Sequence, residues 1–193
     1  MTGLKIIALD KAYVVAGTSY DALEVKSLTA GMLPRVVGKS AREMISLVAA
    51  DAARVPVDLF EVLPSRVADD VYDLVEPELN AFAAATGAHD PGDDAEPAAY
   101  LGPPPPSFTV ALAEPVVVGT TLRVTELELK EPTGKQLATA EREPNQARIY
   151  ITLASLCSGL PRAAIEKLPL PAFTEGVAYL RGFTTGARWT GRR

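Results

Sequence analysis

Apolar and polar residues alternate along the segment between residues 108 and 129. The apolar positions are Phe108, Val110, Leu112, Leu122, Val124, Leu127 and Leu129. A period of two is typical of half-buried antiparallel strands. Glu114 and Pro115 interrupt the first strand, because proline has no N–H to donate to a neighbouring strand, and Gly119 supplies the turn. The pattern therefore predicts a β-hairpin.

A helical region follows this hairpin. The second strand ends at Glu131-Pro132-Thr133-Gly134, where the residue before proline is held extended and Thr133 can cap the first turn of a helix. Apolar residues then recur at helical spacing from Ile149 to Leu160, and Gly159-Leu160-Pro161 breaks the helix. We expect a short helix over residues 163–168 and a final helix lined by Phe173, Val177, Leu180 and Phe183.

The same order of elements occurs earlier in the chain, at an offset that drifts from 102 to 106 residues. Three pairs of segments align: 23–29 with 127–133, 41–47 with 147–153, and 56–64 with 161–169. They share 12 identities in 23 positions, where unrelated sequences of ordinary composition would share about two. We conclude that the chain contains an internal duplication.

The first copy repeats the pattern less cleanly. A hairpin is expected between Lys5 and Lys26, followed by a helix from Ser40 to Arg54. Ser40 is the expected N-cap of that helix, and Glu43 completes a capping box. Pro56 starts a further short helix. A longer helix from Ser65 to Ala85 contains Pro77, which is predicted to kink or divide it.

The predicted fold class is α+β. Each of two tandem units consists of an N-terminal antiparallel hairpin followed by three to four short helices. The first unit spans residues 1–85, an acidic proline-rich linker spans 86–106, and the second unit with a basic tail spans 107–193. The lack of apolar periodicity in the linker predicts proteolytic cleavage within it that leaves two folded fragments. A hairpin has unpaired strand edges, so we also predict that the two copies pack as an intramolecular pseudo-twofold pair.

Charge and reactive residues narrow the possible functions. Residues 1–100 carry a net charge of −8 and residues 101–193 a net charge of +3. We therefore expect the acidic first copy to face the more basic second copy, and we expect no nucleic-acid partner. Arg188, Arg192 and Arg193 are interpreted as a solvated tail. No apolar run is long enough for a membrane span, so a soluble protein of the cytoplasm is expected.

The sequence offers little for catalysis. Gly134-Lys135 lacks the preceding glycine that a phosphate-binding loop needs. The single histidine, His89, lies in the linker, and the single cysteine, Cys157, lies on an expected helix face as a buried thiol. One histidine and one cysteine do not provide metal-ligand spacing. We predict a non-enzymatic protein with no catalytic residue, no metal and no cofactor.

The second hairpin, the Glu131-Pro132-Thr133-Gly134 segment and the helices after it resemble the phage tail assembly chaperones, the family of E-type and Mu-type tail proteins. The resemblance covers roughly residues 108–183. The family-motif residues are Pro115, Gly119, Glu131, Pro132, Thr133, Gly134, Pro161, Glu166, Leu168 and Pro169. Family members are small non-enzymatic proteins encoded between the tail tube and tape-measure genes of a phage or prophage.

The resemblance implies that this protein binds the tape-measure protein in the host bacterial cytoplasm and keeps it soluble before the tail polymerises. The tail tube protein is a further candidate partner. The competing hypothesis is a structural virion protein, such as a tail-completion or baseplate component. We name Phe183 and Trp189, two aromatic residues near the C-terminus, as candidate contacts with the partner.

Overall fold

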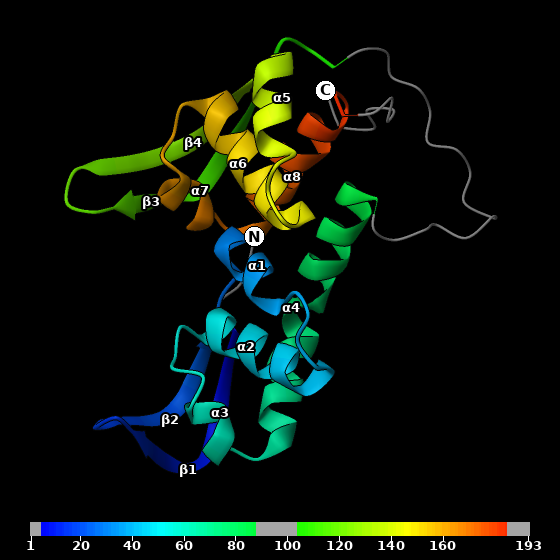
Figure 1. The fold of residues 1–193 in the computed structure, drawn as a ribbon. Helices are drawn as coiled ribbons and strands as arrows, with labels where there is room; N and C mark the ends of the chain where they lie inside the picture. Colours follow the sequence, from blue (N-terminus) through cyan, green and yellow to red (C-terminus); the bar gives the residue numbers. More distant parts are fainter. Residues whose placement is uncertain (1–4, 88–103, 185–193) are drawn as a thin grey trace.

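The computed structural model describes residues 5–87 and 104–184 and has an α+β fold, as predicted (Figure 1). The elements of the first unit are β1 (Lys5–Val15), β2 (Thr18–Val25), the 3-10 turn η1 (Ala30–Met32), α1 (Leu33–Val36), α2 (Ala41–Ala53), α3 (Leu59–Val62) and α4 (Ser65–Thr86). The elements of the second unit are β3 (Ser107–Val118), β4 (Leu122–Lys130), α5 (Gly134–Ala140), α6 (Gln146–Ser158), α7 (Arg162–Glu166) and α8 (Leu170–Arg181). The two units thus have the same order of elements.

Each hairpin is a separate two-stranded antiparallel sheet. In the second hairpin the regular register is interrupted between Ala111 and Val116, which is the site of Pro115. The first hairpin has a corresponding irregularity between Ala8 and Tyr13. Gly17 and Gly119 adopt positive φ angles of 81° and 62° at the two turns, a conformation that glycine reaches without steric cost. The second hairpin therefore has the turn and the interruption that the sequence indicates, and the first hairpin has an irregularity that the sequence did not predict.

Two helices begin as predicted. The Ser40 hydroxyl accepts a hydrogen bond from the Glu43 N–H, and the Glu43 carboxylate accepts one from the Ser40 N–H. Thr133 and Gln136 form the same capping box at the start of α5. Pro77 was predicted to kink or divide the long helix. The prediction of a division was wrong, because α4 continues through Pro77 as one helix of 22 residues.

The two units pack against each other through their last helices, α4 and α8. Phe82 of α4 stacks on Phe173 of α8, with ring centroids 6.1 Å apart. At the C-terminal end of α4, the Arg181 guanidinium donates to the Ala84 carbonyl. Buried apolar side chains of both units form one continuous cluster, while the two hairpins lie far apart (Figure 1).

The packing differs from the predicted pseudo-twofold pair in two respects. Thr29 of the first unit forms an isolated antiparallel bridge with Pro169 of the second. A twofold pair would repeat this bridge between residues 132–134 and 63–65, and within the described residues no hydrogen bond joins those segments. The ion pairs of the described residues all lie within one unit or the other. Backbone hydrogen bonds, apolar contacts and the hydrogen bond from Arg181 to the Ala84 carbonyl join the two units, and no ion pair among the described residues does so.

Candidate protein-binding site

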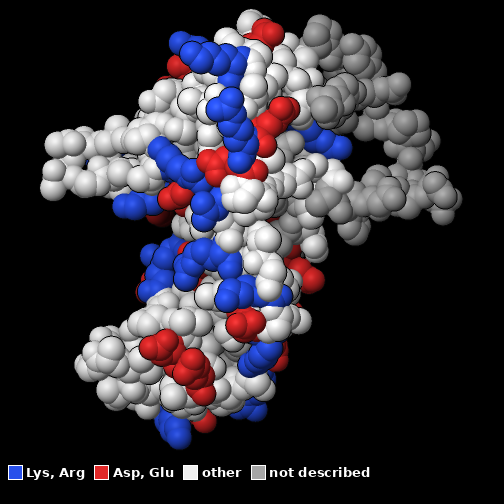
Figure 2. Space-filling view, viewed as in Figure 1, with Lys and Arg blue, Asp and Glu red and all other residues white. Residues whose placement is uncertain are grey.

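The motif residues of the second hairpin shape its projecting end. Pro115 is exposed at the bulge of β3, and Gly119 forms the turn. The tip of this hairpin, from Pro115 to Leu122, carries no charged residue. Within it, Val117 is 54% exposed. In Figure 2 this arm is uncharged at its end, whereas Lys and Arg side chains gather near the middle of the molecule. The motif therefore presents a neutral, partly apolar tip.

The next group of motif residues fixes the passage from β4 into α5. The Glu131 N–H donates to the Pro106 carbonyl at 3.0 Å, which ties the end of β4 to the start of β3. Pro132 is buried, and Thr133 caps α5. Gly134 is the first residue of α5, and a Cβ added there would meet no atom within 4 Å. Packing within this chain therefore does not explain a glycine at position 134.

The remaining motif residues lie where the two units meet. Pro161 precedes α7, and Glu166 at its end accepts a hydrogen bond from the Arg162 guanidinium at 3.1 Å. Leu168 is buried, and its carbonyl accepts from the Ala30 N–H at 3.0 Å. Pro169 bridges to Thr29. The motif segment of the second unit thus contacts the first unit directly.

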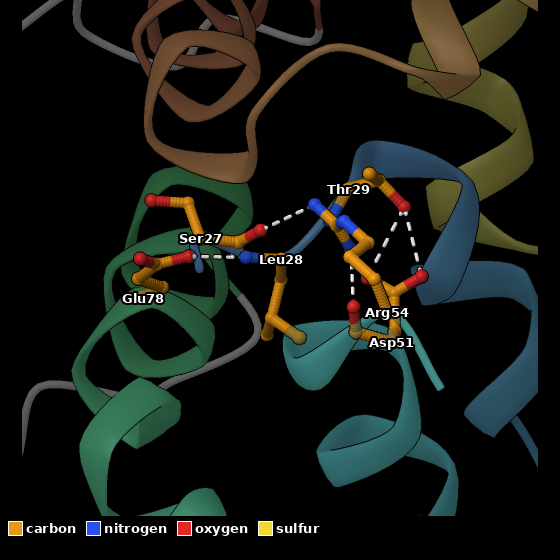
Figure 3. Close-up of polar contacts among 6 residues, drawn as sticks. All are labelled: Ser27, Leu28, Thr29, Asp51, Arg54 and Glu78. Carbon is orange, nitrogen blue, oxygen red and sulfur yellow. Dashed lines mark hydrogen bonds and ion pairs between the residues drawn. The ribbon is translucent and has the colours of Figure 1, made fainter. Parts of the chain in front are cut away.

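A polar cluster in the first unit holds the other side of this junction (Figure 3). The Glu78 carboxylate accepts from the Leu28 N–H at 2.9 Å. Asp51 accepts from the Thr29 N–H at 3.0 Å and from the Arg54 guanidinium at 3.0 Å. Arg54 also donates to the Ser27 carbonyl at 2.7 Å. These side chains fix residues 27–29 so that their backbone can pair with the second unit.

Burial raises the pKa of the Glu78 carboxyl and of the Cys157 thiol. It raises the pKa of the Glu78 carboxyl above its ordinary value, against the opposing effect of the hydrogen bond from the Leu28 N–H. It also raises the pKa of the Cys157 thiol to about 11. Because the thiolate is the nucleophilic form of cysteine, Cys157 is an inert, buried thiol at neutral pH, in agreement with its expected role.

Phe183 lies just beyond α8 and is half-buried in an aromatic cluster. Its ring meets the edge of Tyr179 with centroids 5.2 Å apart, and Tyr179 stacks on Phe108 at 5.3 Å. The Tyr179 hydroxyl donates to the Pro105 carbonyl at 3.0 Å. Trp189 lies outside the described residues, as do His89 and most of the predicted linker. The role of Phe183 and Trp189 in partner binding stays a prediction.

The described residues contain no group of three potential metal ligands. Among the same residues, no helix is both long and apolar enough to cross a bilayer. The chemistry available at the junction and at the hairpins consists of apolar surface, strand edges and hydrogen-bonding groups.

Comparison with known protein families gives a match over the second unit. Residues 109–185 match the family described as "Phage tail assembly chaperone proteins, E, or 41 or 14". The match begins in β3 and extends past α8, so it spans the unit that carries the intact motif. The resemblance recognised from the sequence is confirmed, and it supports a role in phage tail assembly. No curated protein and no solved structure matches the chain.

Sequence reasoning did not find the junction cluster of Glu78, Asp51 and Arg54. Glu78 falls on the half-buried side of α4, where an acidic residue among Val71, Val75 and Leu79 was the available signal. A buried carboxylate needs hydrogen-bond donors, and here the donor is a backbone N–H 50 residues away. A partner so distant in the chain cannot be identified from local spacing.

Proposed function

We propose that this protein is a non-enzymatic tail assembly chaperone that binds the tape-measure protein in the host cytoplasm and keeps it soluble until the tail tube forms around it. The observation that carries the proposal is the family match over residues 109–185. The second unit retains the complete motif, whereas the first unit has Ser27-Leu28-Thr29-Ala30 at the positions of Glu131-Pro132-Thr133-Gly134. The second unit is therefore the one expected to contribute most to binding.

Shape and surface chemistry support binding to an elongated helical partner. A tape-measure protein is a long helical chain, and its apolar stripe needs cover before the tube assembles. Helices of this kind are recognised in apolar grooves, through anchors spaced three and four residues apart. Phe183, half-buried beside Tyr179 at one end of α8, offers an apolar contact for an anchor of such a helix. The neutral tip of the second hairpin, with its exposed Val117, offers a second one.

Co-expression of this protein with the neighbouring tape-measure protein tests the proposal. The soluble yield of the tape-measure protein should rise, and the two proteins should co-purify. Phe183→Ala and Trp189→Ala should each reduce co-purification. Val62→Ala is the matched control, since Val62 is an exposed apolar residue of the first unit, 55% exposed. An unchanged soluble yield with the wild-type chain would contradict the proposal.

The fate of the protein during assembly separates a chaperone from a virion component. A chaperone leaves before the particle is complete, so mass spectrometry of purified particles should detect the tape-measure protein and not this chain. Its presence at a fixed copy number per particle would instead favour the structural hypothesis, in which the chain is a tail-completion or baseplate protein.

A further inference from the structure

Each hairpin turns one apolar face toward the helices of its own unit, and the face of the first hairpin is less buried than that of the second. Ile7 pairs with Leu23 in the first hairpin as Val110 pairs with Leu127 in the second. Val110 is 5% exposed, whereas Ile7 is only half-buried. The same holds at the bulge, where Tyr13 pairs with Tyr20 and both are half-buried. The corresponding pair of the second hairpin, Val116 and Val124, is 9% and 4% exposed.

The position of the last helix explains this difference. In the second unit α8 packs along β3 and touches β4, so closely that a Cβ on Gly176 would lie 2.9 Å from the Leu129 side chain. In the first unit α4 instead packs against α2 and against α8 of the other unit, and the helix with the larger contact on β1 is the short α3. The face of β1 that bears Ile7 and Leu9 therefore lacks the helix that covers β3.

Charge marks the same face. Lys5 pairs with Val25 at the position that Phe108 occupies opposite Leu129. Phe108 stacks on Tyr179 of α8, whereas Lys5 is exposed. At the other end of the strand, the Lys11 ammonium lies 5.3 Å from the centre of the Tyr13 ring. The Tyr13 hydroxyl also donates to the Asp10 carboxylate at 2.9 Å, so it is the Lys5 end of this apolar strip that favours a carboxylate on an amphipathic helix.

We propose that the face of β1 formed by Ile7, Leu9 and Tyr13 binds an amphipathic helix of a partner protein. This helix occupies the place that α8 occupies on β3, and it sets an acidic residue beside Lys5. The chain's own α8 is not available, because Phe173, Val177 and Tyr179 are fully buried in the second unit. The first unit thus provides a helix-binding surface of its own, in addition to the partner contacts proposed for the second unit.

Synthetic peptides with the sequence of residues 168–184 serve as probes, because this segment covers the equivalent face in the second unit. Three versions carry Tyr, Glu or Lys at the position of Tyr179, and fluorescence anisotropy measures their binding to the full chain. The Glu peptide should bind about two to five times more tightly than the Lys peptide, as expected for an exposed ion pair. In the Lys5→Glu variant this order should reverse.

Two further variants define the location of the site. Ile7→Asp should abolish binding of all three peptides. Val14→Asp is the matched control on the opposite face of β1, where Val14 is 69% exposed, and it should leave binding unchanged. Circular dichroism of both variants checks that the fold is retained.

Three results would overturn the inference. The first is the absence of saturable binding by any of the peptides to the wild-type chain. The second is an affinity order that the Lys5→Glu substitution does not change. The third is a dimer, seen by sedimentation, that the peptides dissociate, since this would mean that a second copy covers the face. None of these experiments needs a tail protein, so they test the surface independently of the proposed function.

Discussion

The two hairpins of this chain have the same strand order and a register irregularity at the same place, and each turn contains a glycine with positive φ, yet they differ in how they are covered. The second hairpin buries Val110, Val116, Val124, Leu127 and Leu129 beneath its helices. The first buries only Leu23 and Val25, both near the end of β2. The difference lies in the last helix of each unit rather than in the strands. The two units thus share their elements but differ in the surface on which the last helix packs.

The displaced helix joins the two units. In the first unit α4 has 22 residues, against 12 in α8, and its additional length reaches the second unit, where Phe82 meets Phe173. Because α4 packs against α8, it contributes to the interface between the units rather than to the cover of the first hairpin.

The largest expected effect comes from removing the contact between α8 and its hairpin. Tyr179→Ala deletes a fully buried ring that stacks on Phe108 and should lower the free energy of unfolding by about 3–5 kcal/mol. Leu74 holds the equivalent position of α4, counted from Pro64 and Pro169. Leu74→Ala should cost less than about 2 kcal/mol because Leu74 is only half-buried. Urea denaturation measures both values.

A conservative variant separates the ring from its hydroxyl. Tyr179→Phe removes only the hydrogen bond to the Pro105 carbonyl and should cost about 1 kcal/mol. Equal losses for Tyr179→Ala and Leu74→Ala would show that the two helices contribute alike, and the contrast between the units would not hold.

A smaller effect is expected at the junction of the units. A Cβ on Gly31 would lie 2.9 Å from the Glu166 carbonyl oxygen, a backbone atom that cannot move aside on its own. Gly31→Ala should therefore destabilise the chain by about 1–3 kcal/mol. Gly134→Ala is the matched control in the second unit, where the added methyl group has open space. That variant should be neutral or stabilising by up to about 1 kcal/mol, since alanine is the better helix former.

Thermal unfolding of the two glycine variants gives the comparison directly. If Gly31→Ala is as stable as the wild type, the close backbone approach between Gly31 and Glu166 does not exist in solution.

The smallest effect is the pH dependence contributed by Glu78. Burial raises the pKa of its carboxyl in the folded protein above the unfolded value, so the folded state binds the proton more tightly. Stability from this group is fully present below the unfolded pKa and is lost as the pH rises through the folded pKa. Glu78→Gln keeps an oxygen that can accept from the Leu28 N–H and removes the charge. The variant should therefore gain stability relative to the wild type between about pH 4.5 and pH 7.

The difference in unfolding free energy between wild type and Glu78→Gln, measured across this pH range, isolates Glu78 from the other carboxylates. Glu78→Ala is the contrasting variant. It leaves the Leu28 N–H without its acceptor and should cost about 1–3 kcal/mol at every pH. A Glu78→Gln variant that loses stability relative to the wild type as the pH rises would mean that the folded protein favours the charged carboxylate.

Local patterns allowed much of the fold to be predicted from the sequence. Alternation located the hairpins, Pro115 located the bulge, and the caps at Ser40 and Thr133 located two helix starts, because each of these depends on residues within a few positions of one another. The similarity of the two units could be predicted because their elements follow the same order along the chain. The course of α4 through Pro77 was not predictable in the same way, because its packing against α2 and α8 outweighs the local cost of proline.

The arrangement of the two units was beyond local reasoning. A symmetric pair was the simplest expectation for a duplicated chain, but the junction pairs residues 28–30 with residues 168–170 and has no symmetric repeat among the described residues. The net charges of the two halves predicted that opposite charges would meet between the units. That expectation was wrong, because residues 28–30 and 168–170 meet through backbone groups, and Phe82 and Phe173 meet through their rings. Such contacts depend on which backbone atoms face each other across more than 100 residues of chain.

Amide hydrogen exchange of the intact protein tests the contrast between the units most directly. Protection of strand amides follows the free energy of local opening, which depends on how well the strands are covered. The amides of β3 and β4 that pair across the hairpin should exchange slowly, and those of β1 and β2 should exchange at least tenfold faster at equivalent positions, except near Leu23 and Val25. Equal protection of the two hairpins would contradict the account, because it would mean that the first hairpin is covered in solution as fully as the second.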